Sequence, residues 1–156
     1  MTARGLVRSG LAALVLATLV GGPALPQDLS APPASVRDRF RWPLRGPIVN
    51  GFKSGETDGI DIGAPVGEPV HAAGDGVCIY AGDELKTYGK LVIIRHADGY
   101  VTAYADNSEL DVREGDNVRR GQIIAKSGVG GNVPHLHFEL RKDGKAVDPV
   151  RYLVPL

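Results

Sequence analysis

The stretch Pro134–Arg141 reads PHLHFELR, and it contains two histidines separated by a single residue. Polar and apolar residues alternate along it, which predicts a β-strand: His135, His137 and Glu139 alternate with Leu136, Phe138 and Leu140. Side chains two residues apart on a strand point the same way and lie about 7 Å from each other. The pattern therefore predicts that both imidazoles are displayed outward on one face, while the other face packs into the core. Paired histidines of this kind suggest a metal site.

The chain around this strand also favours β-structure. Further strands are predicted at residues 59–62, 77–80, 91–96, 100–104 and 122–126. The dipeptides Asp98-Gly99 and Asp143-Gly144 are strong signals for tight hairpin turns. No segment has a helical period over three turns, so we predict an all-β, antiparallel fold built from many short strands. In the strand at 59–62, Asp61 points away from both isoleucines, and Thr57 would share its face if the strand continued that far back.

Residues 1–24 are predicted to be a signal peptide. Two arginines precede an apolar run over Leu11–Val20, and small residues follow at a spacing that fits cleavage. The run is short for a membrane span, so an uncleaved anchor is the weaker alternative. Residues 25–40 are rich in proline, serine and alanine and are predicted to form a linker before one domain at 41–156. We expect an exported protein in the periplasm of a Gram-negative bacterium, without a membrane span after cleavage and, because no cysteine lies near the cleavage region, without a lipid.

Charge and cysteine content argue against some functions. Lysine plus arginine number 18 and aspartate plus glutamate number 18, so the formal net charge of zero gives no attraction to nucleic acid or an anionic membrane. Cys78 is the only cysteine, so neither an internal disulfide nor a cysteine-based zinc site can form. Because Cys78 lies in an apolar run, its thiol is predicted to be buried and inert.

From Trp42 onward the chain resembles the LytM (lysostaphin-type) domain of bacterial cell-wall metallopeptidases. Four stretches carry the resemblance, in the order typical of that family: GIDIGAPVGEPVHAAGDGV, YGKLVIIRHADGYVTAY, EGDNVRRGQIIAKSG and HLHFELRKDGKAVDP. The resemblance implies a twisted antiparallel sheet with a groove over it. It also implies an action on or near peptidoglycan, outside the cytoplasm.

The resemblance assigns roles to five positions. Active members of the family bind zinc through a histidine, an aspartate four residues later and the second histidine of the His-x-His pair. On this pattern Asp61 and His137 stand at two ligand positions, and His135 stands at a catalytic position. The other two positions differ, because Thr57 stands where the family has its first zinc histidine and Asp106 where it has its other catalytic histidine.

These two departures predict a site without metal and without catalysis. A catalytic zinc needs three protein ligands and an open position for water. The neutral hydroxyl of Thr57 is a poor third ligand. An ionised Asp106 would repel the negative charge of a transition state that a histidine could stabilise. Glu56 and Asp58 are the neighbours through which a shifted register would restore weak metal binding.

A subgroup of LytM-type proteins has lost the same zinc residues and activates N-acetylmuramoyl-L-alanine amidases, the enzymes that cut the stem peptide from the glycan during cell separation. The sequence resembles this subgroup, so we predict a non-catalytic activator, with no cofactor, that docks on an amidase through the former catalytic groove. Six residues are predicted to line this groove: Lys53, Thr57, Asp61, Asp106, His135 and His137. A purely structural alternative stays open for each, for example that Asp61 hydrogen-bonds His137 and keeps the groove rigid.

Three other functions were possible on the same residues. An active zinc-dependent peptidoglycan endopeptidase with an unusual ligand set would cleave the wall by itself. A scaffold would bind peptidoglycan without touching an amidase. A biotinyl or lipoyl carrier, suggested by EGDNVRRGQIIAKSG, is disfavoured because the chain has no Asp-Lys or Met-Lys-Met tip.

Overall fold

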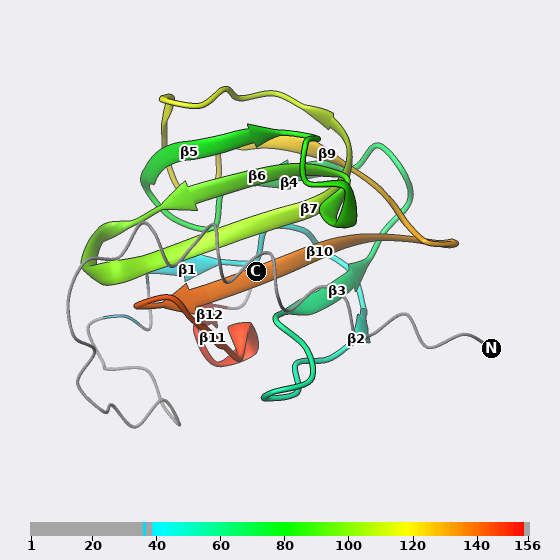
Figure 1. Cartoon of the computed structure of the whole chain (residues 1–156), viewed down its shortest axis with the longest axis horizontal. Helices are drawn as coiled ribbons and strands as arrows, with labels where there is room; N and C mark the ends of the chain where they lie inside the picture. The colour runs from blue at the N-terminus through cyan, green and yellow to red at the C-terminus, as the bar shows by residue number, and fades with distance from the viewer. Residues whose placement is uncertain (1–35, 37–38, 155–156) are drawn as a thin grey trace.

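The computed structural model describes residue 36 and residues 39–154. In this part the chain folds into β-strands connected by turns (Figure 1). The strands are β1 (Phe40–Arg41), β2 (Ile48–Asn50), β3 (Ile60–Gly63), β4 (Pro69–His71), β5 (Gly76–Gly82), β6 (Lys90–Arg95), β7 (Tyr100–Leu110), β8 (Asn117–Val118), β9 (Ile123–Gly130), β10 (Val133–Lys142), β11 (Lys145–Val147) and β12 (Leu153–Val154). The helical elements described are 3₁₀ turns of three residues each: η2 (Lys86–Tyr88), η3 (Ala97–Gly99) and η4 (Pro149–Arg151). The predicted all-β class is confirmed.

One large antiparallel sheet dominates the fold. Its strand order is β2-β3-β10-β9-β7-β6-β5-β8, with β11 attached to β10 and β4 attached to β9. Strand β10 pairs with β3, β7, β9 and β11. Phe138 of β10 lies opposite Ile60 of β3 and also opposite Tyr104 of β7, so segments far apart in the sequence meet at this strand. A separate parallel pair of β1 and β12 adds to the antiparallel sheet that the sequence predicts.

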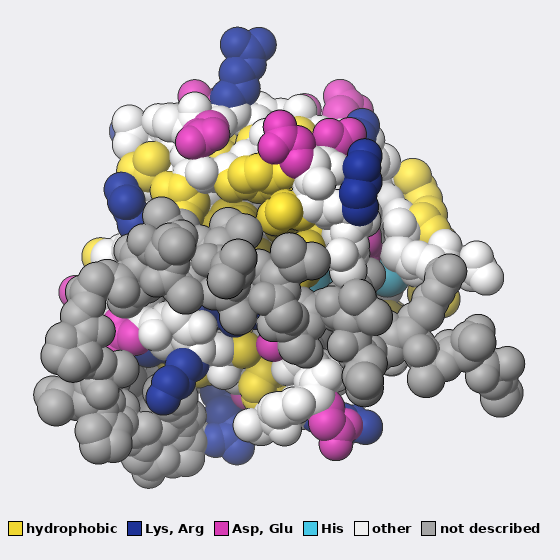
Figure 2. Space-filling model, in the orientation of Figure 1, with side chains coloured by type: hydrophobic (Ala, Val, Ile, Leu, Met, Phe, Trp, Pro, Cys, Tyr) yellow, Lys and Arg dark blue, Asp and Glu magenta, His cyan; other side chains and the backbone are white. Residues whose placement is uncertain are grey.

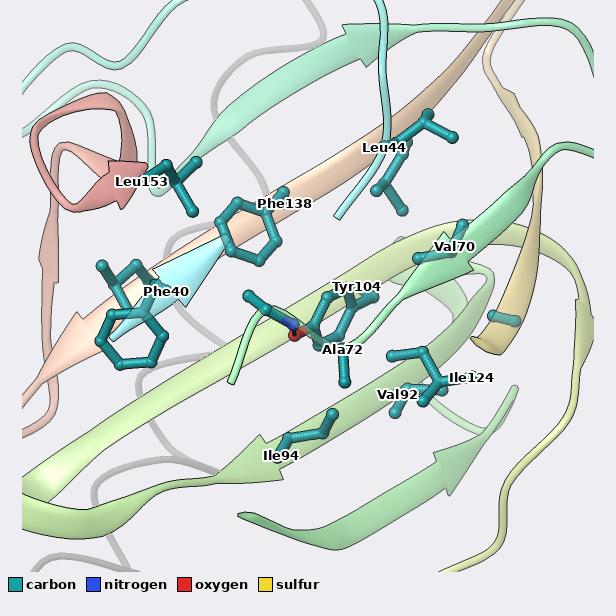
Figure 3. Close-up of a cluster of buried hydrophobic side chains, with 14 of the residues drawn as sticks. Phe40, Leu44, Val70, Ala72, Val92, Ile94, Tyr104, Ile124, Phe138 and Leu153 are labelled. Carbon is teal, nitrogen blue, oxygen red and sulfur yellow. Dashed lines mark hydrogen bonds between the residues drawn. The ribbon is translucent and has the colours of Figure 1, made fainter. Parts of the chain in front are cut away.

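The main hydrophobic core lies on one face of this sheet. Leu136, Phe138 and Leu140, the apolar members of the alternating stretch in β10, are fully buried there. In Figure 3 the rings of Phe40, Tyr104 and Phe138 lie in one cluster with aliphatic side chains from β4, β6 and β9. Burying a side chain of this size contributes about 1.5–3 kcal/mol. The alternation in β10 therefore fixes which face of the sheet carries the core.

Two hairpin turns occur at the predicted dipeptides. Asp98 and Gly99 have φ angles of 59° and 75° between β6 and β7, and Asp143 and Gly144 have φ angles of 49° and 82° between β10 and β11. Aspartate tolerates this left-handed region better than most residues, and glycine enters it without a steric cost. The Asp-Gly sequence thus supplies the backbone conformation that both turns need.

Packed structure begins inside the segment that the sequence assigns to the linker. Val36 and Phe40 are 5% and 0% exposed and belong to the core. The ring of Phe40 packs edge-on against the rings of His96 and Tyr100. The predicted signal peptide lies outside the described residues. Within residues 36 and 39–154, no helix has both the length and the apolar character needed to cross a membrane.

The surface of the domain is of mixed character. Basic and acidic side chains are interspersed over the face shown in Figure 2, in agreement with the zero net charge, and hydrophobic side chains also reach this face. Cys78 is fully buried in β5, where its Sγ atom lies 3.3 Å from the carbonyl oxygen of Tyr80. Burial raises the pKa of this thiol. The predicted buried thiol is confirmed.

Candidate functional site

The polar residues of β10 form a row on the face of the sheet opposite the main core. His135, His137, Glu139 and Arg141 are 5%, 6%, 1% and 4% exposed. The prediction that both imidazoles are displayed outward is therefore wrong. The reason is that β10 lies within the sheet and that a second hydrophobic cluster also occupies this face, including the ring of Tyr88 at 6.5 Å from that of His137. Polar residues at every second position of a strand share one face of the sheet, but this pattern does not indicate whether that face is open to water.

The row belongs to a chain of alternating acidic and basic side chains, which we call the acid–histidine row. His135 Nε2 lies 2.9 Å from Asp106 Oδ2 and 3.7 Å from Asp61 Oδ1. His137 Nδ1 lies 2.7 Å from Asp61 Oδ1, and His137 Nε2 lies 3.0 Å from Glu139 Oε1. Beyond Glu139, the Nε atom of Arg141 donates a hydrogen bond of 3.0 Å to Oε2. The row is defined by these six residues: Asp61, Asp106, His135, His137, Glu139 and Arg141.

Strand pairing brings the members of the row together. Asp61 of β3 lies directly opposite His137 of β10, so their side chains share one face. Asn50 of β2 donates a hydrogen bond of 2.8 Å from Nδ2 to Asp61 Oδ2, which orients the second oxygen of this carboxylate. The hydrogen bond between Asp61 and His137, which the purely structural alternative expects, is present. The structure thus unites four of the six predicted groove residues: Asp61, Asp106, His135 and His137.

Asp106 reaches His135 from an unusual backbone conformation. Its φ angle is 61°, in the left-handed backbone region that residues other than glycine, asparagine and aspartate seldom adopt. Gly130 of β9 allows this close approach, because a Cβ atom there would lie 2.4 Å from both Asp106 Oδ2 and His135 Cε1. Strained conformations of this kind cluster at functional sites, where neighbouring structure holds them in place.

Each charged side chain in the row shifts the pKa of its neighbours so that their charged forms are favoured. Burial alone would lower the pKa of His137, but hydrogen bonds to Asp61 and Glu139 outweigh it and raise this pKa to about 9. Burial would raise the pKa values of Asp61 and Glu139, but the hydrogen bonds and charge of His137 hold both below their ordinary range. The hydrogen bond to Asp106 raises the pKa of His135. At neutral pH, His137 is therefore an imidazolium that donates to two carboxylates.

The remaining two predicted groove residues, Lys53 and Thr57, lie on the turn that precedes β3. The backbone N–H of Lys53 donates a hydrogen bond of 2.7 Å to Thr57 Oγ1, which closes the turn. Thr57 therefore does not extend the strand of Asp61, because β3 begins at Ile60. Lys53 is exposed and forms an ion pair of 3.8 Å with Glu56. Whether these two residues contact a partner stays a prediction.

Sequence reasoning missed three members of the site and its surroundings: Asn50, Glu139 and Arg141. The last two continue the alternating pattern of PHLHFELR, so the sequence carried a signal for them. Asn50 lies on a separate segment and carried no local signal, and Asp58 was considered only as a metal ligand. Asp58 lies 3.6 Å from Arg141, and burial together with the charge of Glu139 raises its pKa.

The residues present do not fit a zinc site. A catalytic zinc needs three protein ligands, and Asp61 and His137 stand at only two of the ligand positions. Thr57 binds its own turn instead. In residues 36 and 39–154, no group of three or more His, Cys, Asp and Glu side chains is arranged to hold a metal ion.

The antiparallel sheet, the His-x-His pair on its central strand and the aspartate opposite together define a LytM-type domain. The chain belongs to peptidase family M23, whose family model matches residues 55–149. This match contains β3 to β11 and all members of the acid–histidine row.

Known relatives give this domain a context. The chain is 44% identical over 117 residues to the murein hydrolase activator NlpD of Escherichia coli. The aligned region covers 73% of this chain and 31% of NlpD. The chain is 48% identical over 117 residues to the outer membrane antigenic lipoprotein B of Haemophilus influenzae, with 73% and 29% covered. The chain thus spans about a third of the length of these relatives. Among solved structures, a zinc-containing peptidase of Vibrio cholerae has a TM-score of 0.66 and 31% identity, with 76% of this chain and 41% of that chain covered.

Proposed function

We propose that this protein is a non-catalytic factor that binds and activates a peptidoglycan N-acetylmuramoyl-L-alanine amidase during cell-wall remodelling and cell separation. The observation that carries the proposal is the placement of Thr57. Its Oγ1 atom accepts a hydrogen bond of 2.7 Å from the backbone N–H of Lys53 within their own turn, so this position does not supply the third protein ligand that a catalytic zinc needs. An M23 domain without that ligand is suited to binding rather than hydrolysis.

The likeness to the murein hydrolase activator NlpD supports activation of a peptidoglycan hydrolase. The acid–histidine row supports it physically, because six linked side chains hold the floor of the site in one geometry before a partner arrives. A preorganised surface loses less conformational entropy on binding. An activator of this kind works by binding the open form of the hydrolase more tightly than the closed form. Lys53 and Thr57, on the turn beside the row, are proposed to complete the docking surface.

The proposal also covers location. The relative from Haemophilus influenzae is an outer membrane lipoprotein by name. We propose that residues 1–24 direct export and that the mature protein acts in the periplasm, where peptidoglycan and its hydrolases lie. Mass spectrometry of the protein isolated from a periplasmic fraction tests this proposal, because cleavage after residue 24 gives a defined mass and an uncleaved chain refutes it.

A dye-release assay tests the main proposal. Labelled peptidoglycan is incubated with the purified protein alone, with a candidate amidase alone, and with both. We expect no release by the protein alone and a clear gain in the rate of the amidase. Lys53→Ala should weaken this gain, while Lys145→Ala, an exposed lysine on β11, should leave it unchanged. An unchanged amidase rate with every candidate would overturn the proposal.

An active endopeptidase is the second candidate, and two observations favour it. The chain resembles the zinc-containing peptidase of Vibrio cholerae, and it keeps Asp61, His135 and His137 of the family pattern. In the same assay this candidate predicts release by the protein alone, stopped by a chelator and restored by zinc. Zinc content of the purified protein gives an independent measure, because the endopeptidase needs one ion per chain.

A further inference from the structure

The turn at residues 51–58 behaves as one closed unit. The backbone N–H of Thr57 donates to the carbonyl of Lys53 at 2.8 Å, and the N–H of Lys53 donates back to Thr57 Oγ1 at 2.7 Å. The N–H of Glu56 donates to the same carbonyl at 3.0 Å, and Gly55 supplies a φ of 78°. These bonds fix the internal shape of the turn. They do not fix its angle relative to the sheet.

Beyond the pairing of β2 with β3 at its two ends, two contacts join the turn to β10. Gly59 lies so close to β10 that a Cβ atom there would be 2.2 Å from the carbonyl oxygen of Phe138. Beside it, Asp58 Oδ2 lies 3.6 Å from Arg141 Nη2. Arg141 is itself held by Glu139, which holds His137. The ion pair of Asp58 and Arg141 thus connects the turn to the acid–histidine row.

This ion pair is poorly explained by stability alone. Its distance of 3.6 Å exceeds that of a hydrogen bond, and within the described residues the Asp58 carboxylate accepts no hydrogen bond. The Nη2 atom of Arg141 is buried and, although 3.0 Å from Glu139 Oε2, it has no hydrogen bond of acceptable geometry. Asp58 keeps 20% of its side chain exposed. Without a hydrogen bond, the pair gains little attraction to offset the cost of burying both charges, and this burial raises the pKa of Asp58.

We propose that Asp58 is a positioning residue, which through Arg141 sets the angle of the 51–58 turn and so shapes the side of the site that a peptidoglycan hydrolase recognises. The proposal rests on the activator function proposed above. Lys53 and Thr57 are carried by this turn, so their placement toward a partner depends on the ion pair. Glu139 gives the same arginine a second carboxylate, which keeps the guanidinium at one position in the row.

The test compares two carboxylates of the same turn. Asp58→Asn removes the charge that faces Arg141, and Glu56→Gln removes the exposed ion pair with Lys53. Each variant is measured by hydrogen exchange of the amides at 52–57, by urea unfolding and by the concentration that gives half-maximal amidase activation. For Asp58→Asn we expect faster exchange in the turn, an unchanged free energy of unfolding because Glu139 still pairs with Arg141, and a roughly fivefold rise in the half-maximal concentration, or about 1 kcal/mol.

The control and rescue variants make the outcome decisive. Glu56→Gln should leave all three quantities unchanged, and Asp58→Glu should restore most of the protection and activation. Faster exchange across the whole sheet, or a large loss of stability in Asp58→Asn, would overturn the proposal in favour of a purely structural role. Unchanged exchange in the turn, or faster exchange with unchanged activation, would also overturn it. If the unaltered protein activates no amidase, the function proposed above fails, and the exchange data then decide the placement of the turn by themselves.

Discussion

Raising the pH from 6.5 to 10 should destabilise this protein through His137. The pKa of His137 is about 9 in the fold, compared with 6.5 as the ordinary value. A histidine whose pKa is raised by folding stabilises the fold fully below its unfolded pKa, and this stabilisation is lost as the pH rises through the folded pKa. The difference corresponds to about 3 kcal/mol, nearly all lost between pH 6.5 and pH 10. The physical reason is that a neutral imidazole cannot donate to Asp61 and Glu139 at once.

The measurement combines urea unfolding at several pH values with an NMR titration of the imidazoles. The variant His137→Gln should show a lower free energy of unfolding at pH 6.5 and a flatter dependence above it. His71→Gln is the matched control, because His71 lies on β4, away from the row, and bonds the carbonyl of Gly121. His135 also has a raised pKa and adds a loss of the same sign, so the comparison of variants isolates His137.

Two results would refute this reasoning. The first is an imidazole of His137 that deprotonates near pH 6.5 in the folded protein. The second is an alkaline loss of stability that is equally large in His137→Gln and in the unaltered chain. Either result would mean that the carboxylates of Asp61 and Glu139 do not hold a charged imidazole between them.

Two further predictions concern other parts of the fold. Gly130→Ala should lower the free energy of unfolding by about 1–3 kcal/mol, because the new Cβ atom would collide with buried Asp106. Gly51→Ala is the control and should not lower it, because a Cβ atom at Gly51 has no neighbour within 4 Å. Urea unfolding of both variants measures the difference. His96 is buried, and burial lowers its pKa to about 4, so its contribution has the opposite sign to that of His137. Stability should therefore fall by about 3 kcal/mol as the pH drops from 7 to 4, and His96→Gln should flatten this acid dependence in the same assay.

Local patterns predicted the elements of this fold well. The alternation in PHLHFELR and the two Asp-Gly dipeptides each encode a property of a few consecutive residues, a strand face or a left-handed turn. Both properties survive folding because nothing elsewhere in the chain contradicts them. Phe40 shows the limit of such patterns, since it is the last residue of the predicted linker and is fully buried, with its ring against those of distant His96 and Tyr100.

The candidate site was predicted only in part, because its members meet through strand pairing. Resemblance to the family supplied Asp61, Asp106, His135 and His137, and the structure joins them. The burial of His135 and His137 follows from the position of β10 inside the sheet, and no local sequence pattern predicts that position. Thr57 would share the face of Asp61 only if the strand continued back to it, and the turn that Thr57 closes lies before β3 begins at Ile60.

The pairing of β3 with β10 also has a consequence for how the domain forms. Asp61 and His137 are 76 residues apart in the chain, and β10 must insert between β3 and its other neighbours. A chain that emerges with its N-terminus first therefore cannot close the sheet until nearly all of it is available. Contacts over such a long loop form slowly, and the apolar strands made earlier stay open to aggregation meanwhile. Truncation before β10 should accordingly leave an unfolded chain rather than a smaller domain.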